Sequence, residues 1–356
     1  MHAVFKYSVR ARIPCIVTAL VLAVVVFASL ASAQTPFYQG KSIRLVMGTS
    51  AGGAQDLWGR FMAQHLGKHI LGSPEIIVQN MPGAGSKIAA NHLYNLAKPD
   101  GLTLAMFNPS LYIEQLIGQK EVKFDWNKFA WIGSPEPINQ VLFVRADTPY
   151  KTLEDIRKAS EPPRCAATGR GTAGHFYPLL IGEALGTKIN MVVGYGGGAD
   201  MDLAIEKGEI HCRAGTASAF VVREPTRTWY KNGFVRPLVQ SGLTRYAKLS
   251  EVPTLYELME THKTPEATRR VAKVMLSSGD LGRPIAAAPG LPADRLKILR
   301  DGFNKMITDA EFLADAKKRG LELIPMSGEE LEKIGKELMV QPADVVERVK
   351  NVLEQK

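Results

Sequence analysis

Residues 43–57 read IRLVMGTSAGGAQDL, and this stretch decides both the fold class and the candidate site. The apolar run at 43–47 predicts a β-strand, and the small residues at 48–53 predict a tight turn. A helix with apolar residues three and four apart then begins near Ala54. Such a turn directs backbone N–H groups and the positive end of a helix toward one point. The stretch therefore predicts a binding site for a carboxylate or a phosphate.

The first 33 residues have the pattern of a secretory signal peptide. Basic residues precede an apolar run at 16–31, and Ala31-Ser32-Ala33 provides the small residues of a cleavage site. An N-terminal membrane anchor is the alternative, but a run of about 16 residues is shorter than the roughly 20 that span a bilayer. We therefore expect residues 1–33 to be removed by cleavage after Ala33 and the mature protein to be exported.

Composition and charge exclude some classes of partner. The 356 residues include 44 Lys and Arg against 35 Asp and Glu, which gives a net charge of +9. Removing 33 of the 356 residues, three of them basic, leaves 323 residues with a net charge of +6. A chain of this length usually divides into two domains. Because no basic run contains interleaved aromatic residues, we expect no nucleic-acid partner.

Short β-rich runs alternate with helical patterns along the mature chain, which predicts an α/β architecture with mainly parallel strands. Three of these runs end in small flexible turns, and such turns mark the sheet edge where α/β proteins bind ligands. Strands are expected at 43–47, 75–79, 102–107, 131–133, 141–144, 164–168, 191–193, 210–214 and 235–240. Helices are expected from Ala54 and from Ser86 as a capping residue, and later at 292–308, 311–318, 328–338 and 342–353.

The turn after the first strand also matches the nucleophile elbow of serine hydrolases, Gly48-Thr49-Ser50-Ala51-Gly52. In that alternative, Ser50 is the nucleophile of an exported hydrolase. No earlier strand is available to position an oxyanion loop, however, and only His175 is placed to serve as the base. We interpret the turn as a binding turn and expect no catalytic residue.

A second glycine-rich turn, Gly169-Arg170-Gly171-Thr172-Ala173-Gly174, matches the letters of a dinucleotide fingerprint. The acid that would hold a ribose is missing, because Asp200 comes too late in the chain. Arg170 is either a partner for a ligand carboxylate or an exposed loop residue. His175 either lines the cleft or packs beneath it.

Histidine and cysteine positions bear on metal sites and covalent links. His65 and His69 lie four residues apart on a helix, but no carboxylate completes a zinc site there. We expect both histidines on a solvated face, with no metal and no cofactor. Cys165 and Cys212 remain after processing and are either a disulfide or two buried thiols.

Several blocks, in this order, resemble the Bug family, the TctC-like solute receptors of tripartite tricarboxylate transporters. They span nearly the whole mature chain, from about residue 37 to 340. The matching blocks are KSIRLVMG at 41–48, GGAQD at 52–56, NMPGAG at 80–85, KPDGLTL at 98–104, YGGGAD at 195–200, EVPTL at 251–255 and PGLPA at 289–293.

The resemblance implies a two-lobed type II periplasmic binding protein fold with a hinge and an interdomain cleft. Residues 36–141 plus 244–356 would form domain 1, and residues 142–243 would form domain 2. It implies a periplasmic receptor that captures a small organic carboxylate and delivers it to the membrane subunits of a tripartite transporter. We expect a monomer. A ligand sensor for a signalling partner is the alternative role.

The resemblance also implies that turns from both lobes hold the ligand. In domain 1, N–H groups around Gly52 and Gly53 would hold the acid. Because Arg170 places a charge in a turn that usually has small residues, we hypothesise that it binds a second carboxylate. The candidate ligand-binding residues are Thr49, Ser50, Gly52, Gly53, Asp56, Asn108 and Ser110 from domain 1, and Thr168, Arg170, Gly171, Thr172, His175, Tyr195, Gly197 and Asp200 from domain 2.

Overall fold

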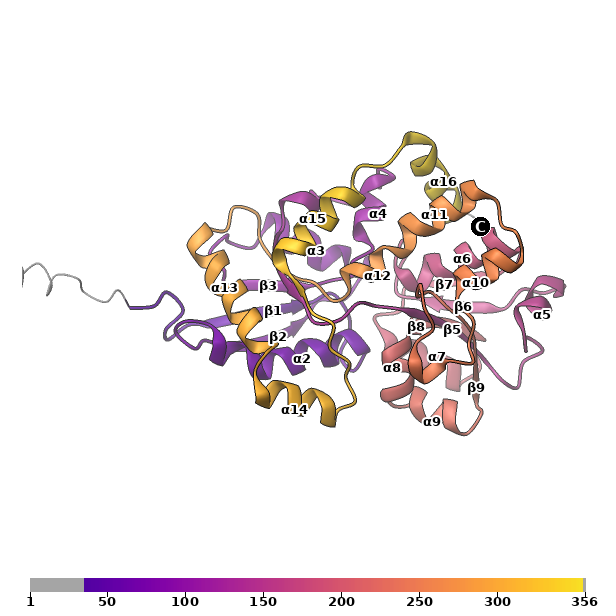
Figure 1. The fold of residues 1–356 in the computed structure, drawn as a ribbon, viewed down its shortest axis with the longest axis horizontal. Coiled ribbons are helices and arrows are strands. Elements are labelled where there is room, and N and C mark those ends of the chain that lie inside the picture. Colours follow the sequence, from indigo (N-terminus) through magenta and orange to yellow (C-terminus); the bar gives the residue numbers. More distant parts are fainter. Residues whose placement is uncertain (1–34, 355–356) are drawn as a thin grey trace, which may run out of the picture.

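The computed structural model describes residues 35–354 as two lobes that lie side by side (Figure 1). The predicted signal peptide at 1–33 lies outside the described residues. Within 35–354, every helix is too short or too polar to cross a membrane.

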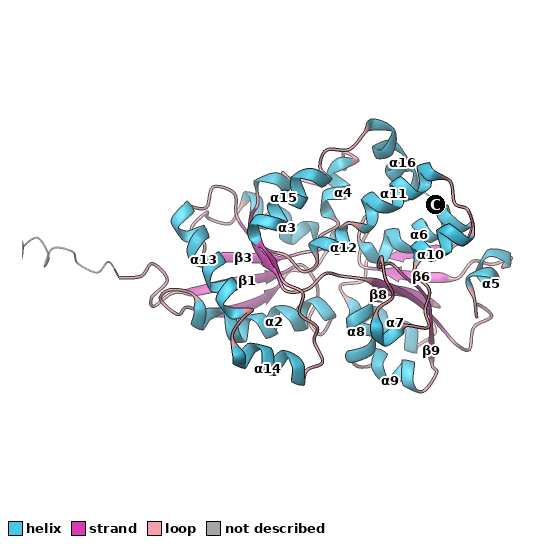
Figure 2. Ribbon diagram, viewed as in Figure 1, coloured by secondary structure: helices cyan, strands magenta, loops and turns pink. Residues whose placement is uncertain are grey.

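The first lobe is built on a six-stranded sheet with the order β11-β4-β10-β3-β1-β2. β1 (Ser42–Met47) is parallel to β2 (Glu75–Asn80) and to β3 (Thr103–Met106). β10 (Ile285–Ala287) is antiparallel to β3 and to β4 (Ala130–Ser134), and β11 (Met326–Ser327) is antiparallel to β4. Helices lie on both faces of the sheet (Figure 2), so the central strands are apolar along nearly their whole length. These helices are α2 (Ala54–Leu66), α3 (Lys87–Asn95), α13 (Ala293–Met306), α14 (Ala310–Lys318) and α15 (Gly328–Leu338).

The second lobe is built on a five-stranded sheet with the order β7-β6-β8-β5-β9. β6 (Arg164–Ala167) is parallel to β7 (Asn190–Val193) and to β8 (Cys212–Thr216). β5 (Gln140–Arg145) is antiparallel to β8 and to β9 (Val235–Gln240). α6 (Ala173–Leu185) covers one face, and α7 (Gly198–Glu206), α8 (Ala217–Val222) and α9 (Thr226–Lys231) cover the other.

The chain passes between the lobes at 135–139, at 277–284 and at 339–342. Two of these segments are joined, because the Ile138 N–H donates to the Gly279 carbonyl at 2.8 Å. The predicted domain boundaries stay a prediction. Three helices from the predicted domain 1 pack against α6 of the second lobe: α10 (Leu255–Thr261), α11 (Glu266–Leu276) and α16 (Ala343–Glu354).

The nine predicted strands are all present, and the last four predicted helices match α13 to α16 to within two residues. The expectation of mainly parallel strands is wrong, since both sheets are mixed. The reason is that β5 and β10 follow segments that cross from the other lobe and enter the sheet in the opposite direction. β10 and β11 were not predicted, because three and two residues are too short to give a pattern.

Three local expectations are settled by the packing. Cys165 and Cys212 lie opposite each other on β6 and β8 and form a disulfide. The prediction of a solvated His65 is wrong: the residue is 5% exposed, and its Nε2 lies 3.2 Å from the Asp315 carboxylate of α14. Ser86 does not cap α3, because its hydroxyl donates instead to the Gly48 carbonyl at 2.9 Å.

Candidate functional site

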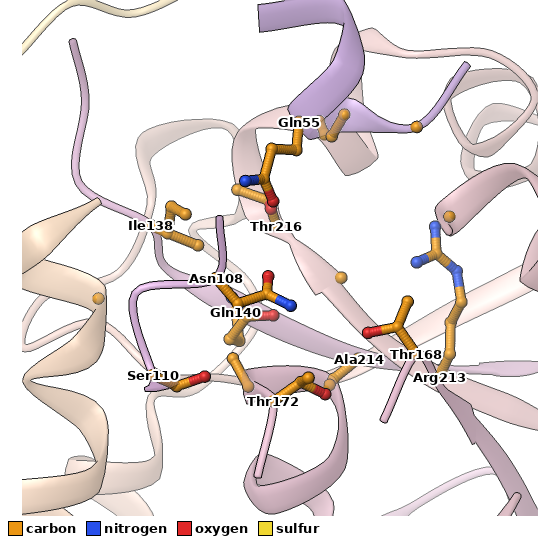
Figure 3. A pocket seen from close by; sticks show the side chains of 18 of the residues that line it. Gln55, Asn108, Ser110, Ile138, Gln140, Thr168, Thr172, Arg213, Ala214 and Thr216 are labelled. Carbon is orange, nitrogen blue, oxygen red and sulfur yellow. The ribbon is translucent and has the colours of Figure 1, made fainter. Parts of the chain in front are cut away.

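A cavity of about 130 Å³ lies between the two lobes, where turns that follow strands of both sheets meet (Figure 3). Its first-lobe wall comes from the turns after β1 and β3, and its second-lobe wall from the turns after β6, β7 and β8. The side chains of Gln55, Asn108 and Gln140 extend into it. It is therefore at the sheet edge that the sequence predicted.

The turn after β1 is held in shape by the carboxylate of Asp56, which is 2% exposed. This carboxylate accepts hydrogen bonds from the Gly52 N–H at 2.9 Å, from Arg60 Nε at 2.9 Å and from Asn80 Nδ2 at 2.8 Å. Burial acts to raise the pKa of Asp56, but these three hydrogen bonds outweigh it, so the pKa lies below its ordinary value. Asp56 thus positions the turn and accepts the hydrogen bond of the Gly52 N–H. Of the two glycines, Gly52 and Gly53, only Gly53 lines the cavity.

Polar atoms on the first-lobe wall of the cavity are buried and lack a hydrogen-bond partner within the described protein. They are Thr49 Oγ1, Gln55 Nε2 and Ser110 Oγ. Thr49 is 8% exposed and Ser110 is fully buried. Because an unsatisfied buried polar group costs free energy, such groups normally have a ligand or water partner. Three such groups on the lining of one cavity are typical of a binding site for a polar molecule.

Two long helices, one from each lobe, begin at the cavity. α2 and α6 each have 13 residues, and Gly53 and Thr172 are the residues that precede them. Gly53 has no side chain to cap α2, and the side chain of Thr172 makes no capping hydrogen bond to α6. The Thr172 hydroxyl donates instead to the Gly169 carbonyl at 2.8 Å. The first turns of both helices therefore keep N–H donors and positive dipole ends for an anion.

The two lobes touch beside the cavity through Ser50. Its N–H donates to the Gly196 carbonyl at 2.9 Å, and its hydroxyl donates to the Asp200 carboxylate at 3.1 Å. A Cβ added at Gly197 would lie 2.4 Å from Ser50 Oγ. The YGGGAD block at 195–200 is therefore glycine-rich at a close contact between the lobes.

Three arginines on the cavity lining were not predicted: Arg213 of β8, Arg223 and Arg283. Arg283 pairs with the buried carboxylate of Glu136 at 2.6 Å. Burial lowers the pKa of Arg213; the Asp202 carboxylate opposes this effect, and the neighbouring Arg223 charge adds to it. The guanidinium nevertheless stays charged. One sequence signal for Arg213 was present, namely a charge inside the apolar run at 210–214.

Of the predicted binding residues, six line the cavity and nine do not. Arg170 is exposed and does not line it, while Ser50, Gly197 and Asp200 form the contact between the lobes. Those on the lining are Thr49, Gly53, Asn108, Ser110, Thr168 and Thr172; those outside it are Ser50, Gly52, Asp56, Arg170, Gly171, His175, Tyr195, Gly197 and Asp200.

His175 packs beneath the cavity and is 4% exposed. Burial lowers its pKa to about 4, and the charges of Arg170 and Lys87 act in the same direction. Nearby, Lys87 of α3 forms a buried ion pair with Glu114 at 2.5 Å. A Cβ added at Gly171 would lie 2.5 Å from Glu114 Oε1, so Gly171 permits a second close contact between the lobes. Across residues 35–354, no group of three or more His, Cys, Asp and Glu side chains is placed to hold a metal ion.

Comparisons with known proteins agree with this geometry. The model of the family described as the tripartite tricarboxylate transporter family receptor, TctC, matches residues 59–350. A UPF0065 protein from the gbd 5' region of Cupriavidus necator is 27% identical over 348 residues, which cover 96% of this chain and 97% of that protein.

Solved structures have the same architecture. The periplasmic binding protein BugD is similar with a TM-score of 0.70 and 19% identity, over 88% of this chain and 98% of that chain. MatC from Rhodopseudomonas palustris with bound malate is similar with a TM-score of 0.67 and 18% identity, over 88% and 99% of the two chains. At these identities the two structures establish the two-lobed periplasmic binding protein fold. With the family match over most of its length, the chain belongs to the tripartite tricarboxylate transporter receptor family, the Bug or TctC family of periplasmic solute-binding proteins.

Proposed function

We propose that this protein captures a small organic carboxylate in the cavity between its lobes and delivers it to the membrane subunits of a tripartite transporter. The observation that supports this most directly is the set of partnerless polar atoms of Thr49, Gln55 and Ser110 on the cavity lining. An ionised carboxylate offers about four acceptor sites, so it can satisfy both hydroxyls and an amide together. The N-termini of α2 and α6 favour a negative charge at the same place.

Closure of the lobes is the step that would complete the site. A ligand enters while the lobes are apart, and closure then surrounds it with donors from both lobes. The hydrogen bonds of Ser50 to Gly196 and Asp200 form only when the lobes meet, so they help to hold the closed form. The closed form presents a different surface from the open one, which is how a membrane partner would recognise the loaded receptor.

Capture explains the turn after β1 better than hydrolysis does. The hydroxyl of Ser50 has a carboxylate, Asp200, as its hydrogen-bond partner, where a hydrolase needs a histidine that can accept the proton. The unpartnered donors on the first-lobe wall of the cavity lie on Thr49, Gln55 and Ser110 instead. We therefore assign the turn to binding.

The site of action would be the periplasm, reached by cleavage of the leader after Ala33. Mass spectrometry of the protein recovered from a periplasmic extract should show a chain that begins at Gln34. A chain that retains residues 1–33 in the membrane fraction would contradict this part of the proposal. A monomer in solution is expected by size-exclusion chromatography with light scattering.

The binding proposal is tested by isothermal titration calorimetry with malate, the ligand held by the related MatC structure, and with a panel of other mono- and dicarboxylates. We expect at least one carboxylate to bind at a ratio of one to one. Thr49→Val should weaken that ligand about tenfold or more, because it removes a hydrogen bond to a charged group. Thr187→Val is the matched control: Thr187 is equally buried and its hydroxyl also lacks a partner, but it lies outside the cavity lining.

Two outcomes would contradict the proposal. One is the absence of any binding heat across the panel. The other is an equal effect of Thr49→Val and Thr187→Val on affinity, which would show that the hydroxyl at the cavity does not contact the ligand.

A further inference from the structure

One end of the cavity reaches into the second lobe, where two arginines share one carboxylate. Arg213 Nη2 lies 2.8 Å from Asp202 Oδ1, and Arg223 Nη2 pairs with Asp202 Oδ2. The side chains are 8%, 9% and 3% exposed for Arg213, Arg223 and Asp202, so the whole cluster is withdrawn from water. Both arginines belong to the cavity lining.

The cluster carries more positive than negative charge. Among the ion pairs of the described residues, Asp202 is the single carboxylate that balances these two guanidinium groups. In addition, Arg213 Nε is buried without a hydrogen-bond partner. The first residue of α7, Gly198, lies against the Arg213 guanidinium, since a Cβ added there would be 3.8 Å from both terminal nitrogens. A buried excess charge beside a helix N-terminus is costly unless an anion accompanies it.

Arg283 differs from this pair although it lines the same cavity. Its guanidinium is balanced one to one by Glu136, and it also donates to Thr216 Oγ1 at 3.3 Å. Its charge is therefore already compensated. The positive charge without a matching carboxylate therefore lies at Arg213 and Arg223.

Apolar side chains line the cavity beside the two arginines. Phe143 and Phe220 pack with ring centroids 4.9 Å apart, and the Arg213 Cζ lies 5.3 Å from the centre of the Phe143 ring. Met201 also lines this part. In Figure 3, the Arg213 guanidinium lies well away from Ser110 and Thr172, which mark the other end. The lining thus has polar atoms for one anion on the first-lobe wall, and apolar side chains next to two guanidinium groups in the second lobe.

We propose that Arg213 and Arg223 form a second anionic subsite inside the second lobe, so that these two residues give the receptor a preference for ligands with two anionic groups. This inference rests on the proposed function, because it takes the first carboxylate to lie at Thr49 and Ser110. It assigns the second carboxylate to Arg213 and Arg223 rather than to the exposed Arg170.

The test is isothermal titration calorimetry with pairs of ligands that differ by one carboxylate: succinate and butyrate, adipate and hexanoate, terephthalate and 4-methylbenzoate. We expect at least one dicarboxylate to bind tenfold or more tightly than its partner. Arg213→Gln and Arg223→Gln should each reduce that preference about tenfold and change the affinity for the monocarboxylate less than threefold. Circular dichroism checks folding, and Arg223→Gln alone decides the matter if Arg213→Gln does not fold.

Arg227→Gln is the matched control. It also removes one positive charge, four residues after Arg223 in the first turn of α9, but the Arg227 side chain is exposed and lies outside the cavity lining. It should leave the preference unchanged. Monocarboxylate binding without a preference for any dicarboxylate would overturn the second subsite and leave the proposed function standing. Loss of the preference in Arg170→Gln, with no loss in Arg213→Gln or Arg223→Gln, would also overturn it. Failure of every ligand to bind would overturn the proposed function as well.

Discussion

Replacing Asp56 by alanine should destabilise the protein and disorder the first-lobe wall of the cavity. The carboxylate is 2% exposed and accepts three hydrogen bonds, from Gly52, Arg60 and Asn80. Asn80 also donates to the Thr49 carbonyl at 2.9 Å, so the same network fixes Thr49, which lines the cavity. The substitution would leave these donors without their charged acceptor.

The size of the effect follows from the exposure of each donor. A hydrogen bond to a charged group contributes roughly 1.5 kcal/mol or more, and this value applies to Gly52 and Asn80. The side chain of Arg60 is 46% exposed, so its share is discounted to that of a surface ion pair, about 0.5 kcal/mol. We expect Asp56→Ala to lower the free energy of unfolding by about 3.5 kcal/mol.

The assay is urea unfolding at pH 7, followed by circular dichroism. Asp301→Ala is the control, because Asp301 also pairs with a basic residue four positions away on a helix but is 48% exposed. It should change the free energy of unfolding by less than about 0.5 kcal/mol. Since the folded pKa of Asp56 is depressed, its contribution is present above its ordinary pKa of 3.8 and is lost as the pH falls through the lower folded value. A loss of less than about 1 kcal/mol in Asp56→Ala at pH 7 would refute this reasoning.

Three further predictions follow from the packing. Replacing Cys165 and Cys212 together by alanine should lower the free energy of unfolding by about 4 kcal/mol, because the bridge closes a loop of 47 residues; an unchanged urea midpoint would contradict a formed disulfide. The folded pKa of His175 is about 4, below its ordinary value of 6.5, so the unfolded chain binds more protons between these two values and the free energy of unfolding should fall by about 1.4 kcal/mol for each pH unit from 6.5 down to about 4. Thermal melts of His175→Gln should show a shallower dependence of stability on pH than the wild-type protein. An identical dependence in the two proteins would refute the low pKa of His175. Gly197→Ala should weaken ligand binding because its Cβ would lie 2.4 Å from Ser50 Oγ, and adding Ser50→Gly should restore part of the affinity; no restoration would mean that the clash lies elsewhere.

Local patterns in the sequence were enough to predict the elements that shape the site. The run at 43–57 gave the strand, the turn and α2, because apolar periodicity and small turn residues are local properties. The same holds for β9, predicted as 235–240 and found there. Positions decided by the partner element were harder, as His65 shows: its burial depends on Asp315 and Phe312, about 250 residues further along the chain.

Which residues of the predicted turns line the cavity and which do not could not be predicted for the same reason. Gly52 lies in the predicted turn and Asp56 in the first turn of the predicted helix, but they form a hydrogen bond with each other and do not line the cavity. Arg170 lies in a predicted ligand turn, yet its side chain is exposed. Arg213 lies on a strand, and its position on the lining depends on the packing of α7 against β8, which no local pattern describes.

The most direct test of the central claim is a crystal structure with the carboxylate that binds most tightly in the calorimetric panel. The account predicts a carboxylate in the cavity between the lobes, with its oxygens about 2.5–3.0 Å from Thr49 Oγ1 and Ser110 Oγ and facing the N-terminus of α6. A carboxylate bound elsewhere on the molecule, with these hydroxyls still lacking a partner in the ligand, would contradict it.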